Sequence, residues 1–320
     1  MAVAIRGKAR KTRARGAAGA GGTDPGAKSR RDRWANRDRT AAAGLLAPNL
    51  VLFTVFIIIP VILALALSFT SWDLVGAPQW IGLGNYRQML ADPAVPQAIE
   101  TTMIFLVLGV VPTVVLGLLL ALLANIQFRF VAVVRTLYFV PAVVSFAASA
   151  VLWQWIYRPG QGILDFLLYK VGITGPAWLS NTHTALPALD IISIWLSLPI
   201  AILLYLAALQ RIPPQIIEAA TLDGAGAFSR LRNIIWPGVR SMTILVVIVT
   251  ILAFTNSSFD LVNILTQGGP INATTTLIYY IYYAAFNNLQ LGYAAALSVL
   301  QLMLFAAILA LLAGARRVAR

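Results

Sequence analysis

Six long apolar stretches constrain this chain more than any other feature of its sequence. They cover residues 45–69, 99–124, 133–157, 186–209, 242–265 and 291–315. A helix needs about 20 predominantly apolar residues to cross the hydrocarbon core of a bilayer. Because lipid offers no hydrogen-bond partners, a spanning segment must pair its own backbone groups, as a helix does. The sequence therefore predicts an all-α polytopic membrane protein with six transmembrane helices.

The composition agrees with this class and excludes several kinds of site. Hydrophobic residues make up 59% of the 320 residues and charged residues only 11%, whereas soluble domains are about 25% charged. The chain has no cysteine and a single histidine, His183, so disulfides, thiolate metal sites and multi-histidine centres are excluded. We therefore expect no metal site and no bound cofactor, and we interpret His183 as a solvated loop residue.

The basic charge is concentrated at the N-terminus. Residues 1–39 contain 12 of the 24 Lys and Arg residues but only 3 of the 11 Asp and Glu residues. We predict that residues 1–40 form a disordered basic tail that attracts anionic lipid headgroups, and that residues 41–320 form the transmembrane domain. The net charge of +13 therefore does not predict a nucleic-acid partner. The first apolar stretch exceeds the roughly 7–15 residues of a signal-peptide core, so we expect it to be retained.

The basic residues also predict the orientation. With a cytoplasmic N-terminus, 21 of the 24 Lys and Arg residues lie on the cytoplasmic side, the exceptions being Arg87, Arg158 and Lys170. The excess of positive charge inside the cell favours this arrangement, which leaves both termini in the cytoplasm of a bacterial inner membrane. The external loops 70–98 and 158–185 are rich in Trp, Gly and Pro. They form either an interfacial aromatic belt or a docking surface for an external partner.

The longest internal cytoplasmic connection, residues 210–240, has a helix–turn–helix pattern. Pro213 and Pro214 can end one helix and begin another, because proline is tolerated in a first helical turn. Asp223-Gly224 is a strong turn signal. A second helical piece is expected over 227–235 and is predicted to end at Pro237. Taken alone, the pattern is also that of an ordinary interfacial amphipathic loop.

Within this segment, Glu218-Ala219-Ala220, Gly224, Ile234 and Pro237 resemble the EAA loop of binding-protein-dependent ABC importer permeases. The family normally has Leu before the final Pro, where this chain has Trp236. The resemblance implies a type I ABC importer permease fold. It also implies that the segment contacts an ATPase subunit through Glu218, Ala219, Ala220, Asp223, Gly224, Ile234 and Pro237. The chain has no Gly-x-x-x-x-Gly-Lys-Ser/Thr phosphate loop, so we expect a non-catalytic subunit whose partner ATPases bind ATP and Mg.

Three further stretches narrow the resemblance. Residues 80–86, 195–199 and Gly268-Gly269-Pro270 are similar to the maltose- and glycerol-3-phosphate-type sugar permeases, and specifically to the first permease of the pair. The resemblance covers roughly residues 40–315. It implies a heterodimer with a second permease, two nucleotide-binding ATPase subunits and an extracytoplasmic solute-binding protein.

The candidate substrate residues are polar or lie near the sugar contacts of this family. The resemblance implies positions near Ser197, Ile200, Thr255 and Ser258, and the polar side chains of Asn256 and Asp260 lie in the same apolar stretch. Alternatively, Ser and Asn here join helices to one another. The spans lack a cluster of Lys or Arg, which favours a neutral sugar. Glycerol-3-phosphate, a glycerophosphodiester or an amino sugar remains open.

Two other classes of membrane protein fit the sequence less well. A proton-coupled secondary transporter needs a proton-linked acidic residue in the membrane and usually repeated halves. Only Asp190 and Asp260 could supply the acid, and no internal repeat is evident. An integral-membrane enzyme is disfavoured by the lack of Cys, the single His and the scarcity of acid–base pairs.

Overall fold

The computed structural model describes residues 44, 46–126 and 131–318, so the predicted tail at 1–40 lies outside the described residues. By its contacts the chain divides into two units, residues 1–61 and 62–320. Of the first unit, the described part is apolar helix with a π-helical turn, η1 (Thr54–Ile58). The packing below is that of the second unit, which begins within α2 (Ile59–Leu67).

Five of the described helices are long and apolar enough to cross a bilayer, at five of the six positions that the sequence predicts. Each is at least 22 residues long, which exceeds the about 20 residues that a span requires. Their bounds are Leu46–Leu67, Ala94–Asn125 (α4), Ala185–Leu209 (α8), Ala227–Thr266, and Leu291–Gly314 within α13 (Leu291–Val318).

The predicted span at 133–157 is not a single straight helix. It is broken into α5 (Val131–Val143) and α6 (Phe146–Ile156), which are bent by 110°. Pro141 lacks an N–H and its ring crowds the preceding turn, so the helix ends soon after it. Ser145 then starts α6 as its N-cap, with Oγ accepting from the Ala148 N–H at 3.3 Å.

The prediction that Pro237 ends a short helix was wrong. Helix α10 (Ala227–Arg230), the π-helical turn η2 (Leu231–Ile235), α11 (Trp236–Leu261) and the π-helical turn η3 (Val262–Thr266) form one 40-residue helix. A proline clashes with the carbonyl four residues earlier in a regular α-helix. The wider turn η2 lies directly before Pro237, and such a π-bulge accommodates the ring without ending the helix.

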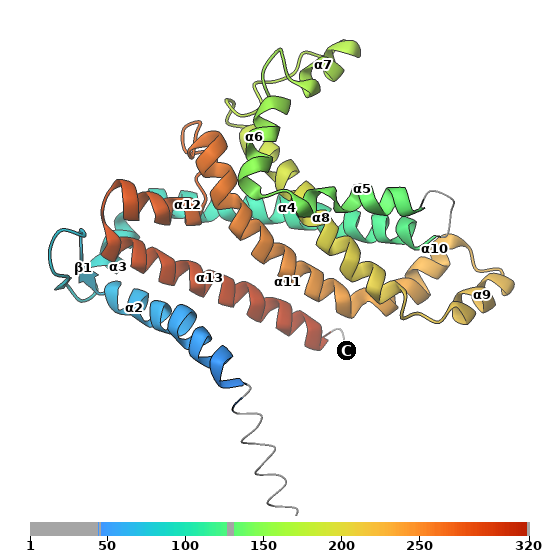
Figure 1. The fold of residues 1–320 in the computed structure, drawn as a ribbon, viewed down its shortest axis with the longest axis horizontal. Coiled ribbons are helices and arrows are strands. Elements are labelled where there is room, and N and C mark those ends of the chain that lie inside the picture. The colour runs from blue at the N-terminus through green and yellow to red at the C-terminus, as the bar shows by residue number, and fades with distance from the viewer. Residues whose placement is uncertain (1–43, 45, 127–130, 319–320) are drawn as a thin grey trace, which may run out of the picture. The chain divides into compact units, whose positions relative to one another are not determined.

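The core of the second unit lies where α8 packs against α4 and α11 (Figure 1). Phe105, Leu189, Phe254 and Leu261 are fully enclosed there. Small residues allow close approach: a Cβ added to Gly117 of α4 would lie 2.8 Å from the Ala201 Cβ of α8. Membrane helices associate through such close contacts, because lipid tails remove the hydrophobic drive for association.

The end of this unit opposite α9 is capped by short elements (Figure 1). A two-stranded antiparallel ribbon was not predicted, because two-residue strands are too short to show alternation. Asn85 anchors it, with Nδ2 donating to the carbonyls of Ser68 and Thr70, both at 2.8 Å. The capping elements are β1 (Thr70–Ser71), β2 (Gln79–Trp80), α3 (Gly84–Ala91), α12 (Leu277–Tyr282) and the π-helical turn η4 (Tyr283–Asn287). Helix α7 (Ile163–Lys170) lies apart from them, beyond the end of α6 (Figure 1).

Asp92 joins three helices at this capped end. Its Oδ2 accepts hydrogen bonds from the hydroxyls of Tyr280 at 2.5 Å and Tyr293 at 2.6 Å, and its Oδ1 accepts from the Ala94 N–H at 2.9 Å. Burial opposes ionisation, but these three hydrogen bonds outweigh it and hold the pKa of Asp92 below its usual value. The carboxylate is therefore ionised at neutral pH and links the start of α4 to α12 and α13.

We expect Asp92→Asn to lower stability at pH 7 by about 1 kcal/mol, because charge-assisted hydrogen bonds become neutral ones. A depressed folded-state pKa stabilises above the unfolded pKa of about 4 and loses that effect as pH falls through the folded value. In thermal unfolding of the detergent-solubilised protein, the deficit should therefore be smaller at a pH well below 4 than at pH 7. Asp73→Asn, in an exposed turn, is the control. An equal deficit at both pH values would contradict the assignment.

Candidate functional site

Helix α9 (Pro214–Leu222) is the first part of the predicted helix–turn–helix. Pro213 is its N-cap and Pro214 its first helical residue, a position where the missing N–H costs no hydrogen bond. The helix ends at Asp223, and Gly224 follows with φ of 79°. This is the left-handed conformation that glycine adopts at little cost. The chain reverses there and enters the 40-residue helix at Ala227, so the predicted helix–turn–helix is present.

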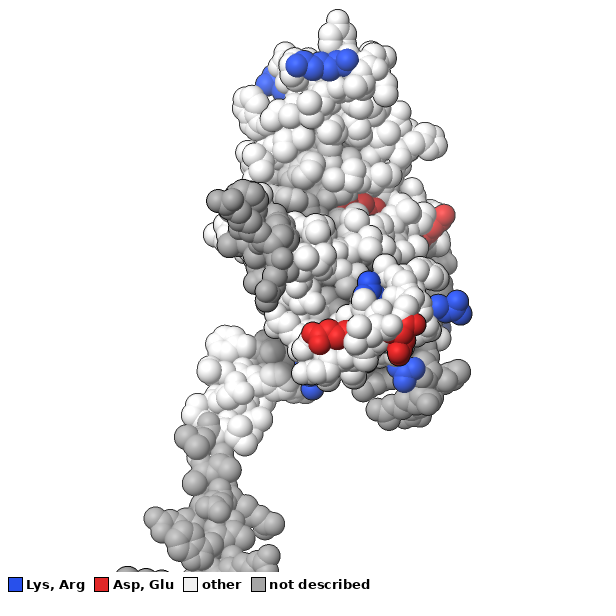
Figure 2. All heavy atoms as spheres, turned by 90° about the vertical axis from the view of Figure 1, so that its right-hand side faces the viewer, with Lys and Arg blue, Asp and Glu red and all other residues white. Residues whose placement is uncertain are grey.

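The outer face of α9 is uncovered. Glu218 and Ala219 are exposed, and Glu218 makes no hydrogen bond or ion pair with any described residue. Leu222 is 89% exposed, and Phe228, just beyond the turn, is 73% exposed. Seen from this end, acidic and basic side chains lie near one another on a surface that is mostly uncharged (Figure 2). Large apolar side chains left this exposed beside charges are typical of a protein–protein contact surface.

The inner face of α9 is held by the rest of the chain. Ala220 and Ile217 are half-buried, and Arg230 Nη1 donates to Thr221 Oγ1 at 2.5 Å across the turn. A cavity of about 490 Å³ separates the helix from α11. Its lining includes Ile216 and Ile234. The element therefore has one face against its own chain and one face free.

The seven predicted coupling residues do not share one environment. Glu218, Ala219 and Ala220 lie on α9, and Asp223 and Gly224 form the exposed turn that ends it. Ile234 instead lines the cavity behind α9, and Pro237 lies exposed in the first turn of α11. The geometry thus brings five of them together on α9 and the turn that ends it. Ile234 and Pro237 belong instead to the 40-residue helix that follows this turn.

The predicted substrate residues divide in the same way. Ile200, which is 38% exposed, and Asn256 present their side chains outward from α8 and α11. Ser197 and Ser258 are buried, Thr255 and Asp260 half-buried. Ser258 Oγ donates to the Thr255 carbonyl at 2.8 Å, within its own helix.

Their neighbour Ser257 has a different role. Its Oγ lies 3.2 Å from Ser193 Oγ, and this hydrogen bond joins α11 to α8 in the core. The alternative that serines of these stretches connect helices therefore holds for Ser257 and Ser193.

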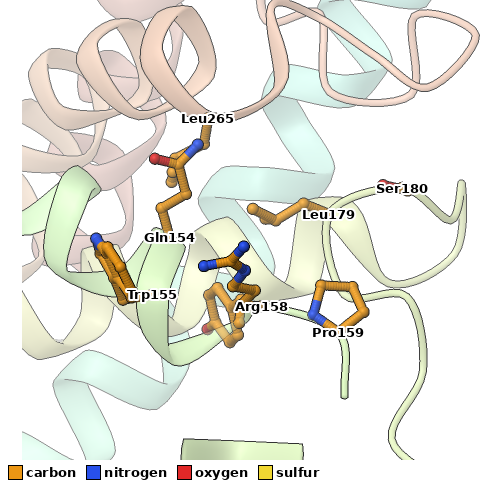
Figure 3. A pocket seen from close by; sticks show the side chains of 8 residues that line it. Gln154, Trp155, Arg158, Pro159, Leu179, Ser180 and Leu265 are labelled. Atoms are coloured by element: carbon orange, nitrogen blue, oxygen red, sulfur yellow. The ribbon is translucent and has the colours of Figure 1, made fainter. Parts of the chain in front are cut away.

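One cavity contains none of the predicted residues. It measures about 460 Å³ and lies between the end of α6, the loop before α8 and Leu265. The side chains of Gln154 and Arg158 extend into it (Figure 3). The Arg158 guanidinium also lies 5.5 Å from the Trp155 ring centre, a cation–π distance. No pattern in the sequence predicts this cavity, because its lining combines the end of α6, the loop before α8 and Leu265.

The comparisons with known proteins agree with this geometry. Residues 113–318 match the family described as binding-protein-dependent transport system inner membrane component. The chain belongs to this family. It is 33% identical over 275 residues to the probable ABC transporter permease YurN of Bacillus subtilis, covering 84% of this chain and 93% of YurN. It is also 32% identical over 263 residues to the sn-glycerol-3-phosphate permease UgpA of Pectobacterium atrosepticum, covering 81% and 88%.

Among solved structures, the permease resembles a chain of a bacterial ABC transporter that imports the acidic polysaccharide alginate. The TM-score is 0.76 at 21% identity, covering 90% of this chain and 98% of the other. The type I importer permease fold predicted from the EAA-type spacing is therefore confirmed. The chain is an ABC transporter permease, a multi-pass membrane subunit that carries no ATPase chemistry of its own.

Proposed function

We propose that this permease forms one half of the translocation pore of an ATP-driven sugar importer and couples to its ATPase through α9. The observation that carries the proposal is the uncovered outer face of α9, where Glu218 and Leu222 have no partner among the described residues. Both termini then lie in the cytoplasm, on the same side as α9. The basic residues of the sequence support that orientation.

The rigidity of the α9 element supports its role in coupling. The turn hydrogen bonds and the Arg230–Thr221 contact hold α9 to the helix that continues as α11. A force on α9 is therefore transmitted along one continuous 40-residue helix into the membrane. Closure of two ATPase subunits around such an element can rotate the membrane helices as rigid bodies. The proposed assembly contains a second permease, two nucleotide-binding subunits that hold ATP and Mg, and an extracytoplasmic solute-binding protein.

A sugar cargo is supported by the relatives and by the uncharged spans. UgpA is named for sn-glycerol-3-phosphate and the solved transporter for alginate. Residues 185–209 and 241–266 of this chain contain no Lys or Arg. Because a membrane site for an anion normally carries basic residues, a neutral sugar fits better than glycerol-3-phosphate. An amino sugar fits the same machinery.

Asn256 gives a test of the pore face. In proteoliposomes carrying the complete transporter, uptake of the sugar that stabilises the cognate binding protein in a thermal-shift panel should require ATP. The panel comprises maltose, trehalose, N-acetylglucosamine and glycerol-3-phosphate. Asn256→Ala should raise the KM for uptake about 2- to 12-fold, the effect of one lost hydrogen bond. Asn287→Ala, at the exposed end of the π-helical turn η4, should leave the KM unchanged. Uptake driven by a proton gradient without ATP would refute the proposal.

A further inference from the structure

A further cavity lies at the end of the permease opposite α9, where α12 packs beside the first turns of α4 (Figure 1). The Leu277 N–H donates to Thr102 Oγ1 at 2.8 Å and fixes this contact. Helix α4 has 32 residues and is therefore about 48 Å long, well beyond the roughly 30 Å of a hydrocarbon core. Its first turns thus extend past the lipid. On the orientation proposed above, they reach the external side.

Between these elements is a cavity of about 340 Å³, called here the Tyr279 cavity. Its polar lining comes from α4, from the loop between η3 and α12, and from α12 with its continuation η4. Tyr280 and two alanines complete the wall. The polar lining residues are Gln97, Gln267, Asn272, Thr275, Tyr279 and Tyr283.

Most of these polar groups are not used by the fold. The side chains of Gln97, Gln267, Asn272, Tyr279 and Tyr283 make no hydrogen bond with any other described residue. Amide and phenol groups both donate and accept hydrogen bonds, so together they offer several donors and acceptors to one small volume. A few convergent polar groups beside aromatic surface are typical of a small-molecule site.

The loop that contributes two of these side chains is held in a defined conformation. Gln267 and Asn272 have φ of 51° and 60°, in the left-handed region that non-glycine residues seldom adopt. The Gln267 N–H donates to the Val262 carbonyl at 2.6 Å, and Thr274 Oγ1 donates to the Gly269 carbonyl at 2.7 Å. A site already ordered in this way loses less entropy on binding than a flexible loop.

The charges around the cavity discriminate among ligands. Among the residues that the structure describes, no Lys or Arg lines it, so an anionic ligand would find no cation in its wall. The hydroxyl of Tyr280, which also lines the cavity, donates a hydrogen bond to the carboxylate of Asp92. This places a negative charge behind the Tyr280 ring. Tyrosine rings supply rigid amphipathic surface for the faces of a sugar. The ligand that fits is therefore polyhydroxylated and uncharged.

We propose that the Tyr279 cavity is an outer subsite that binds one neutral sugar ring and disfavours uronates and sugar phosphates. The inference rests on the proposed sugar cargo, and the site is separate from the candidate residues of α8 and α11. Such a subsite would let the importer distinguish neutral from anionic sugars at its outer end.

The test measures binding directly, in the assembled permease pair with its ATPase subunits in lipid nanodiscs and without the binding protein. Saturation-transfer NMR compares maltose, a neutral disaccharide, with digalacturonate, an anionic one of similar size. Wild type should transfer magnetisation to maltose and not to digalacturonate. Tyr279→Phe and Gln97→Ala should each weaken maltose binding about 2- to 12-fold, the effect of one lost hydrogen bond. The matched control is Tyr282→Phe, since Tyr282 lies on the same helix but packs on Phe259 and does not line the cavity.

A charge variant adds a gain of function. Gln97→Arg should make digalacturonate bind and weaken maltose, because it supplies the missing cation. Absent maltose binding in wild type, equal binding in all variants, or digalacturonate binding as strong as maltose would each overturn the proposal. Loss of ATPase activity in a variant identifies misfolding. In that case the maltose binding of the conservative variant Tyr279→Phe decides whether the cavity binds the sugar. ATP-dependent sugar uptake with unaltered cavity variants refutes this subsite alone, whereas no sugar uptake at all refutes the proposed function.

Discussion

Glu218→Lys is expected to abolish ATP-driven uptake while leaving the permease folded and inserted. Glu218 is exposed and has no partner among the described residues, so its replacement removes no internal contact. If it pairs with a basic residue of the ATPase, reversing its charge leaves two like charges at a desolvated interface, which costs about 2–5 kcal/mol. Docking should weaken about 30-fold or more. Pull-down of the ATPase subunit and uptake in proteoliposomes measure both effects.

The control is the same charge reversal far from α9. Glu100→Lys replaces an exposed glutamate of α4 toward the opposite end of the unit and should retain ATPase binding. A second arm uses Gly224, whose φ of 79° costs a β-branched residue about 1–2 kcal/mol. Gly224→Val should keep ATP hydrolysis but uncouple it from uptake, because the turn that orients α9 is distorted. Normal uptake in both Glu218→Lys and Gly224→Val would exclude α9 as the coupling element.

The helices and the α9 element could be predicted from sequence because each depends on local pattern. A run of apolar residues defines a span whatever packs against it, and Pro-Pro and Asp-Gly act within a few residues. The bend after Pro141 and the passage of the helix through Pro237 could not be predicted in this way. A proline is compatible with a break or with a π-helical turn, and the packing around it selects one of them.

The candidate sites were less predictable because side-chain roles depend on neighbours distant in the sequence. Ser257 and Ser258 are adjacent in the chain and both bond within their own helix, yet Ser257 also bonds to Ser193 of another helix. No local pattern marks Asp92, whose role depends on Tyr280 and Tyr293, which lie 188 and 201 residues later in the chain. The Tyr279 cavity combines residues about 180 positions apart, a distance across which no spacing rule applies.

Gly109→Ala is expected to destabilise the permease strongly, because the added methyl enters a closed contact between two spans. Gly109 lies in α4 where that helix meets α11, and an added Cβ would lie 1.8 Å from Phe254 Cε1. Phe254 is fully buried and packs on Phe105 with ring centres 5.4 Å apart, so its ring has no free space to enter. Overpacking of this kind costs typically about 1–3 kcal/mol, and we expect the upper end. The measurement is the midpoint of thermal unfolding in detergent.

The matched control is Gly314→Ala, another helical glycine of a span, where nothing lies within 4 Å of the added Cβ. It should be neutral or slightly stabilising, since alanine favours helix over glycine by about 1 kcal/mol. The double variant Gly109→Ala/Phe254→Leu should recover part of the loss, because the smaller side chain vacates the space that the new methyl occupies. If Gly109→Ala unfolds like wild type, or if Phe254→Leu gives no recovery, α4 and α11 do not meet at this contact. The same contact also concerns coupling. Helix α9 is joined by a turn to the 40-residue helix that contains α11, so motion of α9 would reach the core where α11 meets α4. A folded Gly109→Ala should therefore also show reduced coupling of ATP hydrolysis to uptake.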